Sequence, residues 1–122
     1  MTADEIFDRA VALMFWESGD KVERLGQFLA TLNVHLLELF ERENALRRAA
    51  GLEALDAPPV VTALSEPVEY QRRILAFLPY GVAGTMLAEE DPPVATQYKN
   101  KYEEERDRCI VARFLDVTDL YR

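Results

Sequence analysis

Few residues of this chain have side chains suited to catalysis or to binding a transition metal. His35 is the only histidine and Cys109 the only cysteine, and they lie far apart in the sequence. A zinc site needs several such ligands at short spacing, and nucleophilic catalysis needs a nucleophile beside a base. The sequence also has no glycine-rich phosphate loop. We therefore expect no catalytic residue, no cofactor and no enzyme activity, and we expect His35 to serve in packing or at an interface.

Carboxylates are abundant, but their spacing does not suit a metal ion. Two groups are dense: Glu38, Glu41 and Glu43, and Glu89, Glu90 and Asp91. Adjacent residues of a helix point away from one another, and neither group has the spacing of a calcium-binding loop. The sequence therefore predicts no metal site.

The composition limits the classes of partner. The 122 residues suffice for one domain with a modest core. The formal net charge of -8 and the pI of about 4.7 argue against binding nucleic acid by neutralising phosphates, which needs clustered Lys and Arg. An acidic wall repels a phosphate backbone, so it suits a conduit for DNA better than a clamp on it.

Cysteine usage and hydropathy bear on the compartment. A single cysteine cannot form a disulfide within the chain, which favours a reducing compartment or a fold that needs no disulfide. No apolar run reaches the length that spans a bilayer, and the first residues lack the basic start of a signal peptide. We expect a protein that makes no membrane contact and is made in the cytoplasm.

The longest predicted element is a helix over residues 20–50. Its apolar residues recur at steps of three and four: Val22, Leu25, Leu29, Leu32, Leu36 and Leu39. Asp20 with Glu23 suits the start of such a helix, and Gly51 suits its end. At about 1.5 Å per residue the helix would be roughly 45 Å long. Its stripe needs a cover, either from the chain's other helices, from copies of the chain, or from both.

Three further helices complete a predicted all-α, four-helix domain with the long helix at its centre. Thr2 and Glu5 form a capping box that starts a helix over residues 3–16. Pro67 suits the first turn of a helix over residues 67–90, and Pro79 predicts a kink inside it. In that helix Gly81 and Gly84 give a smooth surface for close packing. Asp91 and Pro92 start the last helix, over residues 92–115.

Two segments lack a helical pattern. Residues 51–66 contain Pro58 and Pro59, which favour extended chain, and a loop of this length is either functional or a plain connector packed down by its apolar residues. Residues 116–122 are polar with Leu120 and Tyr121 embedded, so we expect a short tail that frays or docks on a partner.

The order of these pieces resembles the small helical head-tail connector, or adaptor, proteins of tailed bacteriophages and prophages. The resemblance covers nearly the whole chain. Its marks are a short opening helix, a long leucine-rich helix, a Pro-Pro-Val-Val-Thr loop and two tyrosines on the last helix. The sequences that carry it most clearly are Gly51-Leu52-Glu53-Ala54-Leu55 and Leu78-Pro79-Tyr80-Gly81-Val82-Ala83.

The resemblance implies a structural role in the neck of a virion, between capsid and tail, for a protein made in the bacterial host. In this family a dodecameric ring of copies sits beneath the portal protein at one capsid vertex. The ring extends the channel through which double-stranded DNA passes without specific binding, and it offers a docking face to the next neck or tail-completion protein.

Residue roles follow from combining the resemblance with the sequence pattern. The expected subunit interface comprises Leu36, Leu39, Gly81 and Gly84. The expected portal-binding residues lie in the tail and are Asp116, Val117, Leu120, Tyr121 and Arg122. The expected channel lining comprises Glu103, Glu104, Glu105 and Asp107, although a solvated helix face is the ordinary explanation of such an acidic run.

Two other classes of protein compete with the connector. A helical assembly or regulatory protein would pair through the leucine-rich helix as a coiled coil and would form a small dimer without affinity for a portal. An enzyme would show a pocket holding perturbed acids or a metal.

Overall fold

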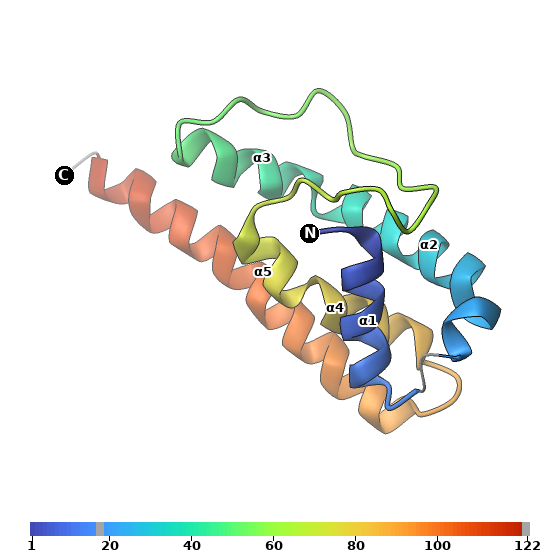
Figure 1. The fold of residues 1–122 in the computed structure, drawn as a ribbon. Coiled ribbons are helices and arrows are strands. Elements are labelled where there is room, and N and C mark those ends of the chain that lie inside the picture. The colour runs from blue at the N-terminus through green and yellow to red at the C-terminus, as the bar shows by residue number, and fades with distance from the viewer. Residues whose placement is uncertain (17–18, 121–122) are drawn as a thin grey trace.

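The computed structural model describes residues 1–16 and 19–120, with side chains as far as residue 109, and in this part of the chain the regular elements are α-helices. Five α-helices follow one another in this part of the chain (Figure 1). They are α1 (Ala3–Leu13), α2 (Asp20–Glu38), α3 (Phe40–Ala49), α4 (Arg72–Met86) and α5 (Pro92–Leu120). The predicted all-α class is confirmed, whereas several helix boundaries differ from the predicted ones.

Helix α4 lies at the centre of the packing, because α1, α2 and α5 all contact it. Most of its side chains are buried, and Ile74, Leu78 and Val82 expose no surface at all. Helices α1 and α2 also contact each other, because the rings of Phe7 and Phe28 stack with their centroids 4.0 Å apart. The helix that the others surround is therefore α4, and the leucine-rich segment covers it from one side.

The predicted single helix over residues 20–50 is divided at Leu39 into α2 and α3. Backbone hydrogen bonds continue across the junction, since Leu39 N–H donates to the His35 carbonyl over 2.9 Å and Glu43 N–H to the Leu39 carbonyl over 2.9 Å. Leu39 is fully buried at this point. Leu39 and Glu43 stay on the buried side that Leu36 begins, and no proline or glycine marks the division in the sequence.

The start of α4 was predicted at Pro67 and lies instead at Arg72. Residues 64–68 pair with the N-terminal segment: the N–H groups of Ala3 and Asp4 donate to the carbonyls of Glu66 and Leu64, over 2.9 and 3.0 Å. These carbonyls satisfy donors that the first turn of a helix leaves unpaired. Because this extended segment is hydrogen-bonded to the start of α1, it does not form the first turns of α4.

The ends of α1 and α5 also differ from the prediction. Helix α1 stops at Leu13, where Phe15 adopts a left-handed conformation with φ of 58° and Trp16 N–H donates to the Val11 carbonyl over 3.1 Å. A helix end hydrogen-bonded in this way usually has glycine at the left-handed position. Helix α5 continues to Leu120, so most of the predicted tail is helical. No glycine or proline follows Pro93 to end the helix earlier.

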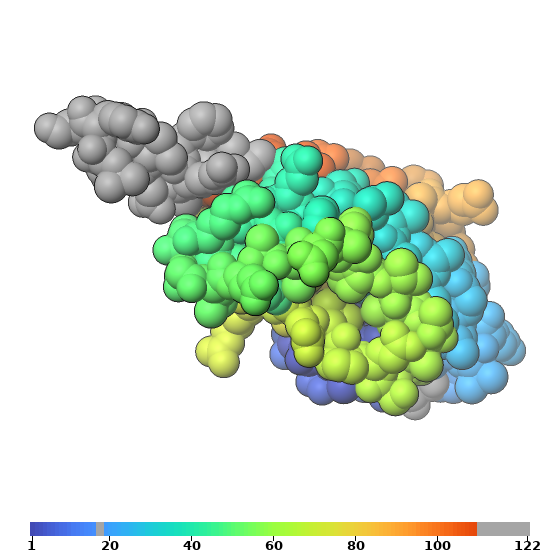
Figure 2. All heavy atoms as spheres, turned by 90° about the horizontal axis from the view of Figure 1, so that it is seen from above, coloured from blue at the N-terminus to red at the C-terminus, as the bar shows by residue number. Residues whose placement is uncertain are grey.

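The long connection between α3 and α4 is held against α2 and α3 by side-chain amides. Asn33 exchanges two hydrogen bonds with the backbone of Val61, at 2.9 and 2.8 Å, and Asn44 exchanges two with the backbone of Leu55, at 3.1 and 2.7 Å. The space-filling view shows the connection lying along these helices (Figure 2). The segment predicted as a long loop is therefore irregular in backbone but fixed in place.

The close contact of α4 with α5 depends on two glycines. A Cβ atom at Gly81 would lie 2.7 Å from the ring of Tyr102, and one at Gly84 would lie 2.9 Å from Cγ of Lys99. The small-residue surface expected to accept another helix thus accepts α5 of the same chain.

We predict that Gly81→Ala lowers the free energy of unfolding by about 1–2 kcal/mol, because overpacking against Tyr102 outweighs the better helix propensity of alanine. The matched control is Gly26→Ala, since that helix position has no atom within 4 Å of an added Cβ. The control should raise the free energy of unfolding by up to about 1 kcal/mol. Urea denaturation at low protein concentration measures both, and equal effects of the two substitutions would contradict the packing argument.

Candidate functional site

The expected subunit-interface residues are used inside the chain. Leu36 and Leu39 are fully buried in the core. Gly81 and Gly84 lie beneath α5, as described above. In this conformation the four residues contact the chain's own helices and present no surface on which a second copy can dock.

The acidic residues expected to line a channel lie on α5. Glu103, Glu104 and Asp107 are exposed, and Glu105 is half-buried. Part of their charge is compensated, because the guanidinium of Arg108 donates to the carboxylates of Glu104 and Glu105 over 2.9 Å each. The segment is therefore a mixed ionic surface with an acidic excess, and its position relative to a channel remains a prediction.

The expected portal-binding residues fall at the C-terminal end of α5. Asp116, Val117 and Leu120 belong to the last turns of this helix, and Tyr121 and Arg122 lie outside the described residues. Figure 1 shows these last turns extending past the ends of α3 and α4. The end of α5 is therefore placed away from the packed helices, where another molecule has access to it.

His35 and Tyr102 are buried between α2, α4 and α5, and each contacts a polar side chain that is exposed. The Nε2 of His35 lies 3.2 Å from the Thr85 hydroxyl, and its ring meets the ring of Tyr102 edge to face with centroids 4.9 Å apart. The Tyr102 hydroxyl donates to Glu38 over 2.5 Å. Burial, together with the hydrogen bond to Glu38, raises the pKa of Tyr102, and burial lowers the pKa of His35. This arrangement locks three helices together, as expected for a histidine with a packing role.

Cys109 is also buried, on the side of α5 that faces the core. Burial raises the pKa of its thiol, so the reactive thiolate is disfavoured. Among the described residues no group of three His, Cys, Asp or Glu side chains is arranged to hold a metal ion.

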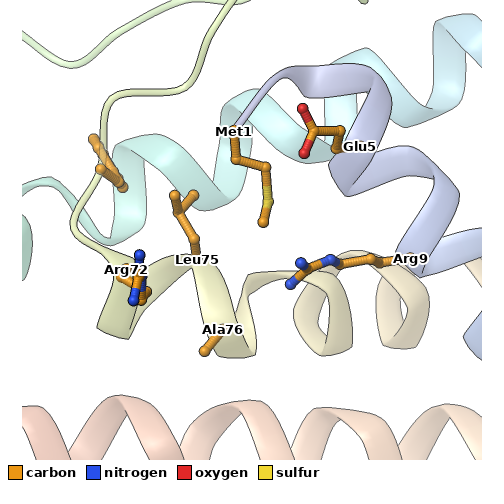
Figure 3. A pocket seen from close by; sticks show the side chains of 7 residues that line it. Met1, Glu5, Arg9, Arg72, Leu75 and Ala76 are labelled. Carbon is orange, nitrogen blue, oxygen red and sulfur yellow. The ribbon is translucent and has the colours of Figure 1, made fainter.

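A cleft of about 600 Å³ opens between α1 and the start of α4 (Figure 3). It is lined by Met1, Glu5, Arg9, Tyr70, Arg72, Leu75 and Ala76. Figure 3 shows Arg9 and Arg72 on opposite sides of an apolar floor that includes Leu75 and Ala76. Neither arginine makes a hydrogen bond or an ion pair with any residue that the structure describes. The cleft thus combines apolar surface with two guanidinium groups that are free to bind an anion.

A second apolar surface lies on the outer side of α2. It consists of five exposed residues, mostly four apart, which we call the α2 strip: Val22, Gly26, Ala30, Val34 and Leu37. Val22, Val34 and Leu37 are 83%, 61% and 64% exposed. The sequence analysis placed Val22 in the stripe to be covered, whereas the structure leaves it facing outwards. The spacing of four, with glycine and alanine in the middle, was the signal in the sequence for this second face.

Comparison with known proteins does not assign this chain to a group. No protein-family model, curated protein sequence or solved structure matches it. Within the described part of the chain, no helix is both long and apolar enough to cross a membrane. We therefore infer a function from the surfaces described above and from the motifs in the sequence.

We predict that His35 makes stability depend on pH near neutrality. Because burial lowers the pKa of His35 below its ordinary 6.5, the unfolded chain takes up a proton before the folded chain does. The contribution of His35 to the free energy of unfolding should therefore be constant above about pH 7.5 and be lost progressively as the pH drops below about 6.5. The change is measured as the urea midpoint at several pH values. His35→Gln, which keeps a hydrogen-bonding side chain but does not titrate, should flatten the profile between about pH 7.5 and 5.5, and an unchanged profile would refute this assignment.

Proposed function

We propose that this chain is a head-tail connector, or adaptor, of a tailed bacteriophage or prophage. In this role copies of the chain form a ring beneath the portal protein, extend the DNA channel and dock the next neck or tail-completion protein. The observation that carries the proposal is the end of α5, which extends past the packed helices and holds the residues expected to bind the portal.

The sequence of this helix end supports a docking role. Ile110, Phe114, Val117 and Tyr121 recur at steps of four, three and four, which is the spacing of an apolar helix face. A projecting helix with such a pattern suits insertion into a groove of a partner protein. The acidic composition is also compatible with DNA passing close by without sticking.

The competing assembly or regulatory protein would dimerise through the leucine stripe. That dimer is at odds with the fold, because Leu32, Leu36 and Leu39 are fully buried against the chain's own helices. Exposing them would remove the cover of α4. The connector interface expected at Leu36 and Leu39 meets the same obstacle, so a ring of copies has to form through other, exposed surfaces.

We predict that deleting residues 116–122 leaves the helical fold intact but removes attachment to the portal. Residues 116–120, the part of the deleted segment that the structure describes, belong to the end of α5 that extends past the other helices, so α4 keeps its packing against α1, α2 and the rest of α5. The measurement is the native mass of the chain, alone and mixed with the portal protein of the same phage or prophage, with far-UV circular dichroism as a check on folding. Gln97→Ala, at an exposed position near the other end of α5, is the control and should bind as the unmodified chain does. Portal binding that survives the deletion would exclude this role for the tail.

We also predict that some of Glu103, Glu104, Glu105 and Asp107 face the axis of the assembled ring. The reason is that carboxylates repel the phosphate backbone of DNA and keep it mobile within a channel. A cryo-electron microscopy map of the ring bound to its portal shows whether these side chains face the axis. If all four side chains lie on the outer surface, the channel is lined by another element.

A further inference from the structure

Two separate faces of this molecule combine apolar side chains with an excess of charge of one sign. One is the cleft between α1 and α4, and the other is the α2 strip with its neighbours. The two faces come from different helices and have opposite character. They are therefore able to complement each other between two copies of the chain.

The cleft is the basic face. Its guanidinium groups, from Arg9 and Arg72, lie on either side of the apolar floor and bind no described residue (Figure 3). Glu5 is the one carboxylate in the lining, and it hydrogen-bonds to Thr2 as part of the capping box of α1. Two free arginines beside Leu75 and Ala76 suit a ligand that presents a carboxylate next to an apolar side chain.

The α2 strip, together with the exposed carboxylates around it, is the acidic face. Glu41 follows Leu37 by four residues, and its exposed side chain has no hydrogen bond or ion pair with any described residue. Of the basic residues between positions 22 and 41, Arg24 is partly exposed but paired with Glu90 over 2.6 Å, and His35 is buried. Val60 adds to the apolar surface, since it is 70% exposed and adjoins Val61, which Asn33 of α2 holds by two hydrogen bonds. Leu37 with Glu41 is thus an apolar side chain with a carboxylate beside it.

We propose that the cleft of one copy receives Leu37 and Glu41 of the next copy, with the Glu41 carboxylate bound by Arg9 and Arg72. The leucine side chain lies on the floor formed by Leu75 and Ala76, and the carboxylate accepts hydrogen bonds from the guanidinium groups. This contact deepens the proposed function, on which it rests for the existence of a ring, by naming the two faces that join its subunits.

The charges favour a head-to-tail contact. Two clefts placed face to face would bring arginine against arginine, whereas a cleft against a strip brings opposite charges together. A contact between two different faces leaves one free cleft and one free strip on every pair of copies, so further copies can add to both ends. The product is a closed ring where the rotation between neighbours closes and an open filament where it does not. A symmetric dimer would use the same face on both copies and would stop there.

The test uses two variants, each with one face damaged. Leu37→Asp damages the strip, and the double substitution Arg9→Glu with Arg72→Glu damages the cleft. The native mass of each purified full chain is measured alone and in an equimolar mixture, at the highest soluble concentration. The unmodified chain should assemble beyond a dimer, and each variant alone should be monomeric. The mixture should form a dimer and go no further, because one intact cleft meets one intact strip.

Matched controls carry the same chemical changes at other exposed positions. Phe15→Asp places a carboxylate at an apolar position that is 85% exposed, and Arg48→Glu with Lys101→Glu reverses two exposed charges. Both should assemble as the unmodified chain does. If a face variant fails to fold, Leu37→Ala and Arg9→Ala with Arg72→Ala replace it, and each should weaken assembly by about tenfold or more.

The outcomes separate this inference from the proposed function. A monomeric unmodified chain, face variants that assemble normally, or a mixture that stays monomeric would each overturn the inference. Normal assembly of the face variants together with normal portal binding would leave the connector role in place with a different subunit contact. The expected dimer from the mixture, without any portal binding by the unmodified chain, would support the contact and remove the connector role.

Discussion

The buried carboxylate of Glu43 is the constraint on which much of this structure depends. The side chain exposes no surface, so its charge needs partners inside the protein. Arg47 donates to it over 2.6 Å, and the backbone N–H of Gln71, at the start of α4, donates over 2.6 Å. Arg47 in turn binds the carbonyls of Glu53 and Glu69. One ion pair thus joins α3, both ends of the long connection and the first turn of α4.

This ion pair also explains features that local sequence patterns did not contain. Glu43 continues the buried side of Leu36 and Leu39 into α3, and the extended segment before Arg72 brings Gln71 within reach of it. Periodicity describes one helix at a time, whereas the partners of Glu43 and the start of α4 depend on contacts between segments far apart in the sequence. For the same reason the predicted start at Pro67 failed, although proline is well suited to a first helical turn.

Patterns within a single helix were more informative. The capping box of Thr2 and Glu5 is present as predicted, and Asp20 and Pro92 mark the starts of α2 and α5. The small residues of α4 do accept a closely packed helix. The sequence did not determine which molecule supplies that helix, because a smooth surface suits a helix of the same chain or of another copy equally well. The sequence did not predict the cleft either, since Arg9 and Arg72 come together only through the packing of α1 on α4.

The surfaces left outside the core share a common origin. Each helix has a limited apolar arc, and α4 uses the arcs of α1, α2 and α5 that face it. Val34 and Leu37 lie on the opposite side of α2 from Leu32 and Leu36, so they do not contribute to the core. A helix with apolar residues on two sides is typical of one that is covered twice, once within the chain and once by a partner.

The position of Cys109 gives this protein a natural reporter of its own motion. Its thiol is the only one in the chain, is 4% exposed, and is kept protonated by burial. A thiol-specific reagent therefore reacts only when α5 opens away from its neighbours, and the labelling rate measures the free energy of that opening. Because α5 holds both the buried tyrosine contact and the projecting end, the same rate reports how firmly the projecting end is anchored when it is pulled or bound.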